Sequence, residues 1–97
     1  MYARVARFEG GEADAIRQNA EEMGSRAESG PPEGVPANGF FLLVDPDNGR
    51  GLAITLFETE DDLRKGDQVL NSMSPPGDGM GHRASVEEYE VAIDVRL

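Results

Sequence analysis

The chain has a single histidine, His82, in a segment rich in glycine and proline. Imidazole is the side chain that ordinarily exchanges a proton near neutral pH. As a catalytic residue, His82 would be a general base that removes a phenolic proton from a substrate. The alternative is a histidine that is simply solvated. A metal site with Asp45, Asp47 and Asp78 is a third interpretation, but no known ligand spacing supports it, so we predict no metal site.

Four other polar residues are candidates to line a ligand pocket: Tyr2, Arg4, Asn71 and Tyr89. Arg4 has apolar neighbours in an expected strand and would orient a carboxylate, quinone or phenolate through paired hydrogen bonds. The alternative for Arg4 is an ion pair with Glu88 or Glu90 on the last expected strand. For Asn71, at the end of an expected helix, the alternative is packing or capping.

Motifs of nucleophilic and nucleotide chemistry are missing from the sequence. It contains no cysteine and no G-x-S-x-G motif, so nucleophilic catalysis has no support. The glycine-rich residues 78–81 lack the strand–loop–helix context of a phosphate-binding loop. We therefore predict that the protein uses no cofactor.

The charge balance argues against several classes of partner. The 97 residues include 19 acidic and 9 basic side chains, for a formal net charge of −10. Nucleic-acid binding depends on clustered Lys and Arg, and here the basic residues are scattered, so neither nucleic acid nor membrane is an expected partner. No apolar stretch is long enough for a signal peptide or a membrane span, which predicts a cytoplasmic protein.

Hydrophobic periodicity divides residues 1–97, taken as one domain, into six elements. Strands are expected at 2–8, 39–45, 51–57 and in a final alternating run to residue 97, and helices at about 12–28 and 60–73. Asn48-Gly49 predicts a tight hairpin turn, and Thr59 predicts the N-cap of the second helix. Gly66 inside that helix suggests a close approach to the sheet.

The order strand–helix–strand–strand–helix–strand predicts an α+β, ferredoxin-like βαββαβ fold with a four-stranded antiparallel sheet and both helices on one face. Both faces of the central hairpin are apolar. We expect Phe40, Leu42 and Val44 to share one face with Leu52, Ile54 and Leu56, and Phe41 and Leu43 to share the other with Ala53 and Phe57. Exposing about four such side chains would forgo roughly 6–12 kcal/mol. We therefore expect a homodimer that pairs through the open sheet face.

The chain resembles the dimeric α/β-barrel superfamily and, within it, the small antibiotic-biosynthesis-monooxygenase-like (ABM-like) domains. The resemblance rests on the length, the βαββαβ order and three segments, residues 2–8, 57–63 and 86–91. It implies two four-stranded sheets that close into a barrel between subunits, with a pocket between each sheet and its own helices. Haem-degrading relatives use a histidine on the second helix, whereas this helix has Asn71 and no histidine, which argues against haem.

Two functional hypotheses follow. The resemblance implies a cofactor-independent monooxygenase that acts on a small aromatic or quinone-like molecule. The residue types themselves suggest His82 as its base and Tyr2, Arg4, Asn71 and Tyr89 around the ligand. The alternative is a non-catalytic dimeric module that binds a small hydrophobic ligand or takes part in a stress response. The residues alone identify neither substrate nor reaction.

Overall fold

The computed structural model describes residues 1–73 and 81–97. In these residues, four strands and two α-helices follow one another in the order strand–helix–strand–strand–helix–strand, with one 3-10 turn between the middle strands. The elements are β1 (Tyr2–Glu9), α1 (Ala13–Ala27), β2 (Gly39–Asp45), η1 (Pro46–Asn48), β3 (Arg50–Phe57), α2 (Glu60–Asn71) and β4 (His82–Glu90).

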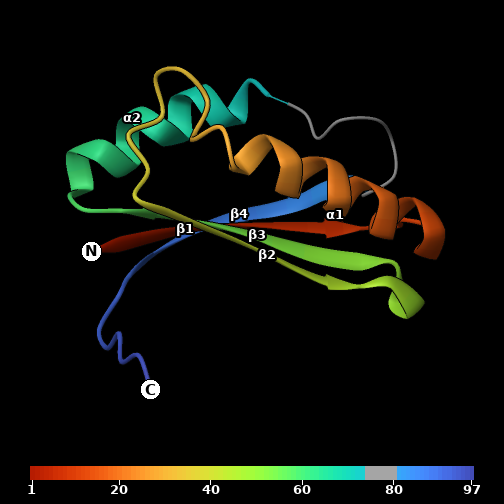
Figure 1. Cartoon of the computed structure of the whole chain (residues 1–97). Coiled ribbons are helices and arrows are strands. Elements are labelled where there is room, and N and C mark those ends of the chain that lie inside the picture. The colour runs from red at the N-terminus through yellow and green to blue at the C-terminus, as the bar shows by residue number, and fades with distance from the viewer. Residues whose placement is uncertain (74–80) are drawn as a thin grey trace.

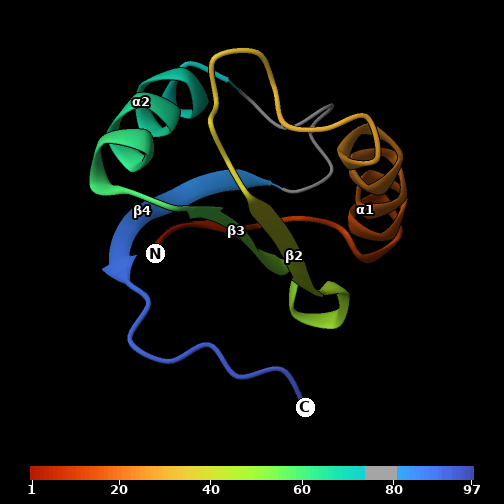
Figure 2. The ribbon, with the colours of Figure 1, turned by 60° about the vertical axis from the view of Figure 1, so that its left-hand side comes forward.

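The four strands form one antiparallel sheet in the order β2-β3-β1-β4. Both helices lie on the same face of this sheet, and the opposite face is open (Figures 1 and 2). This is the ferredoxin-like arrangement that the order of elements predicts, because a crossover helix packs back onto the sheet on one side only. The expected α+β fold is confirmed.

The start of α2 is set by its cap. Thr59 has an extended backbone, and its side-chain oxygen accepts a hydrogen bond from the backbone N–H of Asp62 at 3.1 Å, as expected. Leu63 and Gly66 on the inner side of α2 are buried. A Cβ at Gly66 would overlap the ring of Phe57, which is itself fully buried. The glycine therefore allows α2 to approach β3 closely.

The hairpin expected at Asn48-Gly49 joins β2 to β3, but of these two residues only Gly49 has a positive φ. Asp45 pairs with Arg50, and residues 46–49 form a 3-10 turn in which only Gly49 has a positive φ, of 67°. The resulting register pairs Phe40 with Thr55 and Phe41 with Ile54.

This register corrects the expected faces of the hairpin, because residues directly opposite each other in an antiparallel pair point to the same face. On the helix-covered face, Phe40, Leu42 and Val44 lie with Ala53, Thr55 and Phe57. On the open face, Phe41 and Leu43 lie with Leu52, Ile54 and Leu56.

The buried core lies between the sheet and the helices in two clusters. The first contains Ala6, Phe8 and Ile16, with partly buried apolar side chains around them. The second contains Val35, Phe57 and Leu63. The clusters lie under α1 and α2 respectively, and the space between the two helices is left for the site described below.

The predicted long last strand is wrong in its second half. β4 ends at Glu90, and residues 91–97 have no regular secondary structure. The side chains of Ile93 and Val95 are 81% and 67% exposed. This C-terminal segment (residues 91–97) leaves the sheet on the side away from the helices (Figure 2).

In the part of the chain that the structure describes, no helix is long and apolar enough to cross a membrane.

Candidate functional site

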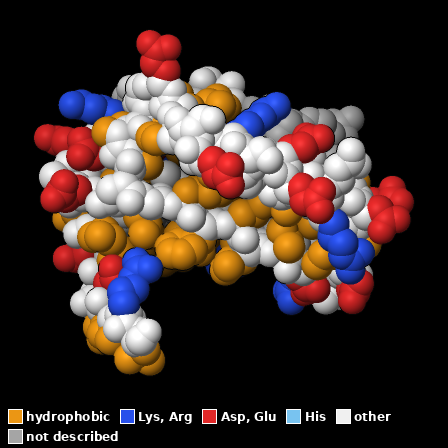
Figure 3. Space-filling view, in the orientation of Figure 1, with side chains coloured by type: hydrophobic (Ala, Val, Ile, Leu, Met, Phe, Trp, Pro, Cys, Tyr) orange, Lys and Arg blue, Asp and Glu red, His pale blue; other side chains and the backbone are white. Residues whose placement is uncertain are grey.

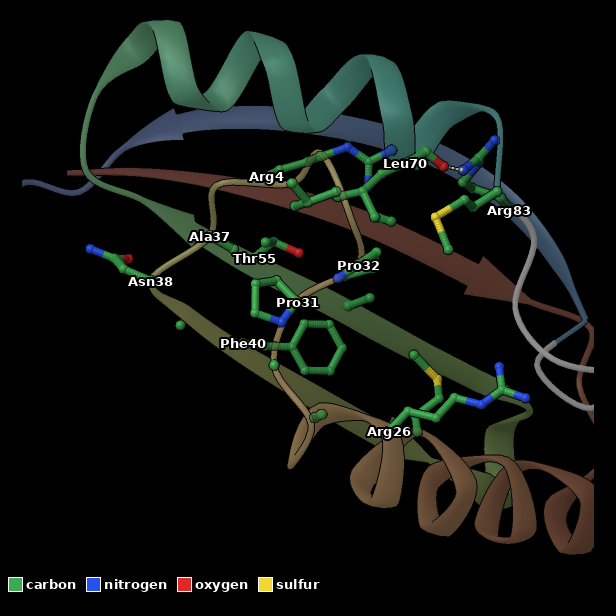
Figure 4. A pocket seen from close by; sticks show the side chains of 18 of the residues that line it. Arg4, Arg26, Pro31, Pro32, Ala37, Asn38, Phe40, Thr55, Leu70 and Arg83 are labelled. Carbon is green, nitrogen blue, oxygen red and sulfur yellow. Dashed lines mark hydrogen bonds between the residues drawn. The ribbon is translucent and has the colours of Figure 1, made fainter.

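A cavity of about 630 Å³ lies between the helix-covered face of the sheet and the helices, and it is partly open to solvent. Its floor is formed by β1, β2 and β3, and its walls by the end of α1, the segment 30–38, the end of α2 and Arg83 (Figure 4). Most of the lining is apolar, as in small-molecule sites, whose volumes run from about 300 to 1,000 Å³. The apolar lining residues include Phe8, Met23, Val35, Phe40, Leu70 and Met73.

Arg4 is the buried charged residue of this cavity. Its side chain comes from the middle of β1 and is only 4% exposed. Its Nε donates to Oδ1 of Asp67 at 2.7 Å, and its Nη2 donates to Oδ1 of Asn71 at 2.9 Å. Asn71 in turn donates from Nδ2 to Oδ2 of Asp67 at 3.1 Å. The three side chains form a closed network that fixes the guanidinium under α2.

The Nη1 group of Arg4 has no hydrogen-bond partner among the described residues. A buried guanidinium ordinarily uses most of its five donors. Because Arg4 lines the cavity, its unused donors are available to a ligand. A guanidinium with unused donors can hold an oxygen atom of a bound molecule by hydrogen bonds.

Of the expected pocket residues, the structure brings together Arg4 and Asn71. Asn71 accepts a hydrogen bond from Arg4, which lines the cavity, but Asn71 does not line the cavity itself. Tyr2 also points to the helix-covered face, but it packs against the cluster of Val35, Phe57 and Leu63 beside the cavity. The expected ion pair of Arg4 with Glu88 or Glu90 does not form, since Asp67 takes that place.

Tyr89 lies on the open face of the sheet, away from the cavity, and is 50% exposed. Its hydroxyl donates to Oε2 of Glu87, and Nε of Arg7 donates to Oε1 of the same carboxylate. The hydrogen bond to Glu87 raises the pKa of the Tyr89 phenol. The hydrogen bonds from Tyr89 and Arg7 lower the pKa of Glu87. This network belongs to the open face, not to the cavity.

His82 is the first residue of β4, is exposed and lies beside Gly10. It does not line the cavity, so its role as a general base stays a prediction. Within residues 1–73 and 81–97, no group of three His, Cys, Asp or Glu side chains could hold a metal ion. Asp78, one of the residues considered for a metal site, lies outside the described residues.

Sequence reasoning missed Asp67, Arg26 and Arg83. Asp67 holds Arg4, and Arg26 and Arg83 line the cavity from α1 and β4 (Figure 4). Asp67 and Asn71 are four residues apart, and this spacing places them on one side of a helix. That spacing was the available signal. Arg26 and Arg83 come from elements far apart in the sequence, and no sequence pattern indicates that they line the same cavity.

Comparison with solved structures finds a similar fold. The structure of the haem-degrader MhuD from Mycobacterium tuberculosis, with two haems bound in its active site, superposes with a TM-score of 0.67 at 20% sequence identity. The match covers 99% of this chain and 100% of that chain. A mutant of MhuD with two manganese protoporphyrin IX molecules per active site matches with a TM-score of 0.64, again at 20% identity, over 99% of both chains.

No protein-family model matches the chain, and no curated protein matches it. At 20% identity, the likeness to MhuD establishes the fold alone. The βαββαβ fold expected from the sequence is thereby matched by solved structures over nearly the whole chain. The nature of the ligand and of any reaction must be argued from the cavity.

Proposed function

We propose that this protein binds a small aromatic or quinone-like molecule in the cavity between sheet and helices and oxidises it there as a cofactor-independent monooxygenase. The observation that carries the proposal is the apolar cavity of about 630 Å³ with the buried guanidinium of Arg4 at its wall. In such sites, apolar contacts to the body of the ligand supply most of the binding energy, and a few fixed polar groups of the protein orient the ligand.

Arg4 gives this cavity a chemical role. A phenol bound with its oxygen against Nη1 would ionise more readily, because the guanidinium stabilises the phenolate. An electron-rich phenolate is the form that reacts directly with dioxygen. In the balanced reaction, the phenol loses its hydroxyl hydrogen and one ring C–H hydrogen and becomes a quinone. One atom of dioxygen becomes the new carbonyl oxygen, and the other leaves as water with the two hydrogens.

The described lining does not favour haem as the substrate. Haem iron is usually held by histidine, cysteine, tyrosine or methionine. The lining has no histidine, and His82 lies outside it, so methionine is the only such ligand type that the described lining residues offer, in Met23 and Met73. The haem-degrading activity of MhuD is therefore not transferred to this chain.

The test is a binding and oxidation assay with a panel of quinols and phenols. Ala53→Phe would fill the cavity floor, whereas Ala84→Phe places the same ring on an exposed residue of β4 outside the cavity. We expect Ala53→Phe to abolish both ligand binding and ligand-dependent dioxygen uptake, and Ala84→Phe to retain both. Equal binding by the two variants would place the ligand elsewhere.

A second candidate function is non-catalytic binding of a small hydrophobic ligand. One observation favours it: in the described part of the chain, the lining contains no His, Asp, Glu, Cys or Tyr that could accept a proton. If this second function is correct, some of the quinols and phenols would bind, but none of them would cause dioxygen uptake. Loss of turnover in a folded His82→Ala variant would instead eliminate the non-catalytic interpretation.

The open face of the sheet supports a homodimer. Phe41, Leu43 and Tyr89 on this face are 43%, 51% and 50% exposed, and the C-terminal segment adds further exposed apolar side chains. Figure 3 shows hydrophobic side chains along the side of the sheet and on the projecting C-terminal segment, with acidic side chains over the helices. Contiguous apolar surface of this kind usually marks an interface.

Sedimentation velocity with a matched pair of variants tests the dimer. Leu43→Asp puts a charge on the open face, and Val44→Asp puts it on the helix-covered face of the same edge strand. We expect the wild type and Val44→Asp to sediment as dimers and Leu43→Asp as a monomer. A monomeric wild type would overturn this part of the proposal.

A further inference from the structure

The charges around the cavity are unlike those of the rest of the molecule. The chain has 19 acidic and 9 basic residues. Among the described residues that line the cavity, three are arginines, Arg4, Arg26 and Arg83, and none is Asp or Glu. The described lining thus contains a third of the chain's cationic side chains and no carboxylate, and Asp67, which pairs with Arg4, lies outside that lining.

Two of these arginines carry charge that no described carboxylate balances. Arg4 is paired with Asp67. Arg83 donates from Nη1 to the carbonyl of Leu70 at 3.2 Å and from Nη2 to the carbonyl of Asn71 at 3.0 Å, both of which are neutral groups at the end of α2. Arg26, in the last turn of α1, forms no ion pair within residues 1–73 and 81–97.

Arg26 and Arg83 come from opposite walls of the cavity (Figure 4). Both are exposed, so they lie where the cavity meets solvent. The repulsion of an anion by the net charge of −10 is screened over about 8 Å at physiological ionic strength, whereas a guanidinium in contact with the ligand is not. The local positive charge therefore decides which ligands bind.

From this charge pattern we infer that the ligand is an aromatic acid, an apolar ring body that carries an anionic group bound by Arg26 and Arg83. This rests on the proposed function and narrows its ligand class. The ring body occupies the apolar floor, and the acid group lies at the rim. Arginine suits this role because its planar fork binds an oxyanion with two hydrogen bonds.

Two fluorescent probes with the same ring skeleton test the inference. Anilinonaphthalene sulfonate carries an anionic group, and N-phenyl-1-naphthylamine lacks it. We expect the wild type to bind the sulfonate at least about ten-fold more tightly than the neutral probe. We expect Arg26→Gln to weaken sulfonate binding about five- to ten-fold and to change neutral-probe binding less than about two-fold, since one charge-assisted contact is lost.

Arg17→Gln is the matched control, because Arg17 is an exposed arginine of the same helix that does not line the cavity. It should leave the affinity for both probes unchanged. Arg26 makes no described ion pair, so its substitution is not expected to unfold the protein. Arg83→Gln, which also removes hydrogen bonds to α2, is measured second and is checked by circular dichroism.

The outcomes separate the two proposals. Equal affinity for both probes, with no effect of Arg26→Gln, would overturn the aromatic-acid inference while cavity binding stands. Failure of both probes to bind, or binding of the sulfonate that survives Ala53→Phe, would overturn the proposed cavity itself. Selective weakening of the sulfonate by Arg26→Gln but not by Arg17→Gln would support the inference.

Discussion

Arg4 on the first strand and Asp67 on the second helix form a partly buried ion pair, with 2.7 Å between Nε and Oδ1. The two residues are 63 positions apart in the sequence. Their contact ties α2 to the centre of the sheet and presents the remaining edge of the guanidinium to the cavity. One side chain thus serves both the stability of the fold and the polarity of the site.

Replacement of Arg4 tests this double role. We expect Arg4→Gln to lower the free energy of unfolding by about 1–3 kcal/mol, because hydrogen bonds to Asp67 and Asn71 are lost and Asp67 is only partly exposed. We also expect it to weaken binding of phenolic ligands. Arg4→Lys should not restore either property, since an ammonium group cannot reproduce the two directed bonds. Urea unfolding and ligand titration measure both effects.

The two helical glycines should respond in opposite ways to alanine. In α2, Gly66→Ala would drive a Cβ into the buried ring of Phe57, and we expect a loss of about 1–3 kcal/mol. In α1, a Cβ at Gly24 meets nothing within 4 Å, so Gly24→Ala should gain about 0.5–1 kcal/mol from helix propensity. Thermal unfolding compares the pair. A stabilising Gly66→Ala would contradict the close approach.

The Tyr89–Glu87 hydrogen bond predicts a shifted phenol titration. Tyr89 should titrate above its ordinary value of 10.0, since the hydrogen bond and the negative charge of Glu87 favour the neutral phenol. In a Tyr2→Phe background, Tyr89 is the single remaining tyrosine. Its absorbance change then reports one group, and Glu87→Gln should move the midpoint back toward 10.0. An unchanged midpoint would show that the bond does not persist in solution.

Asp45 predicts a loss of stability in acid. Hydrogen bonds from Asn48 and then Arg50 lower its pKa in the folded protein below the ordinary value of 3.8. The stabilisation is therefore present above that value and is lost as the pH falls through the lower, folded value. The stability advantage of the wild type over Asp45→Asn should shrink as the pH falls from about 6 to about 3. Denaturant midpoints across this range measure it.

Hydrophobic periodicity predicted the strands, the helices and their order, because an element with one buried face has apolar residues at a regular spacing in its sequence. It failed for residues 91–97. Their alternation is that of a strand, but β1 begins at Tyr2, and the N–H of Val91 already bonds the carbonyl of Met1. Beyond that point no residue in the described part of the chain pairs with the segment. A local pattern shows that a segment is amphipathic, and only the length of its neighbour shows whether it is paired.

The site was predicted only in part for a related reason. Arg4 and Glu88 are direct partners in the β1–β4 ladder, so an ion pair between them was a reasonable expectation. α2 packs over Arg4, however, and brings Asp67 closer to Nε. The distance between a helix and a sheet depends on residues such as Gly66 and Phe57, whose contact is tertiary. Sequence spacing therefore identified Arg4 and Asn71 but not the carboxylate that joins them.

The segment between α1 and β2 forms one wall of the cavity with exposed residues, Pro31, Pro32 and Asn38, that contribute little to the strand pairing. Its backbone joins the sheet at a single place, through the N–H of Asn38 and the carbonyl of Leu56. Substitutions at the exposed positions Pro31 and Pro32 would reshape the cavity while the ladder of β1, β3 and β4 stays intact. Ligand preference in this protein can consequently diverge during evolution much faster than its architecture.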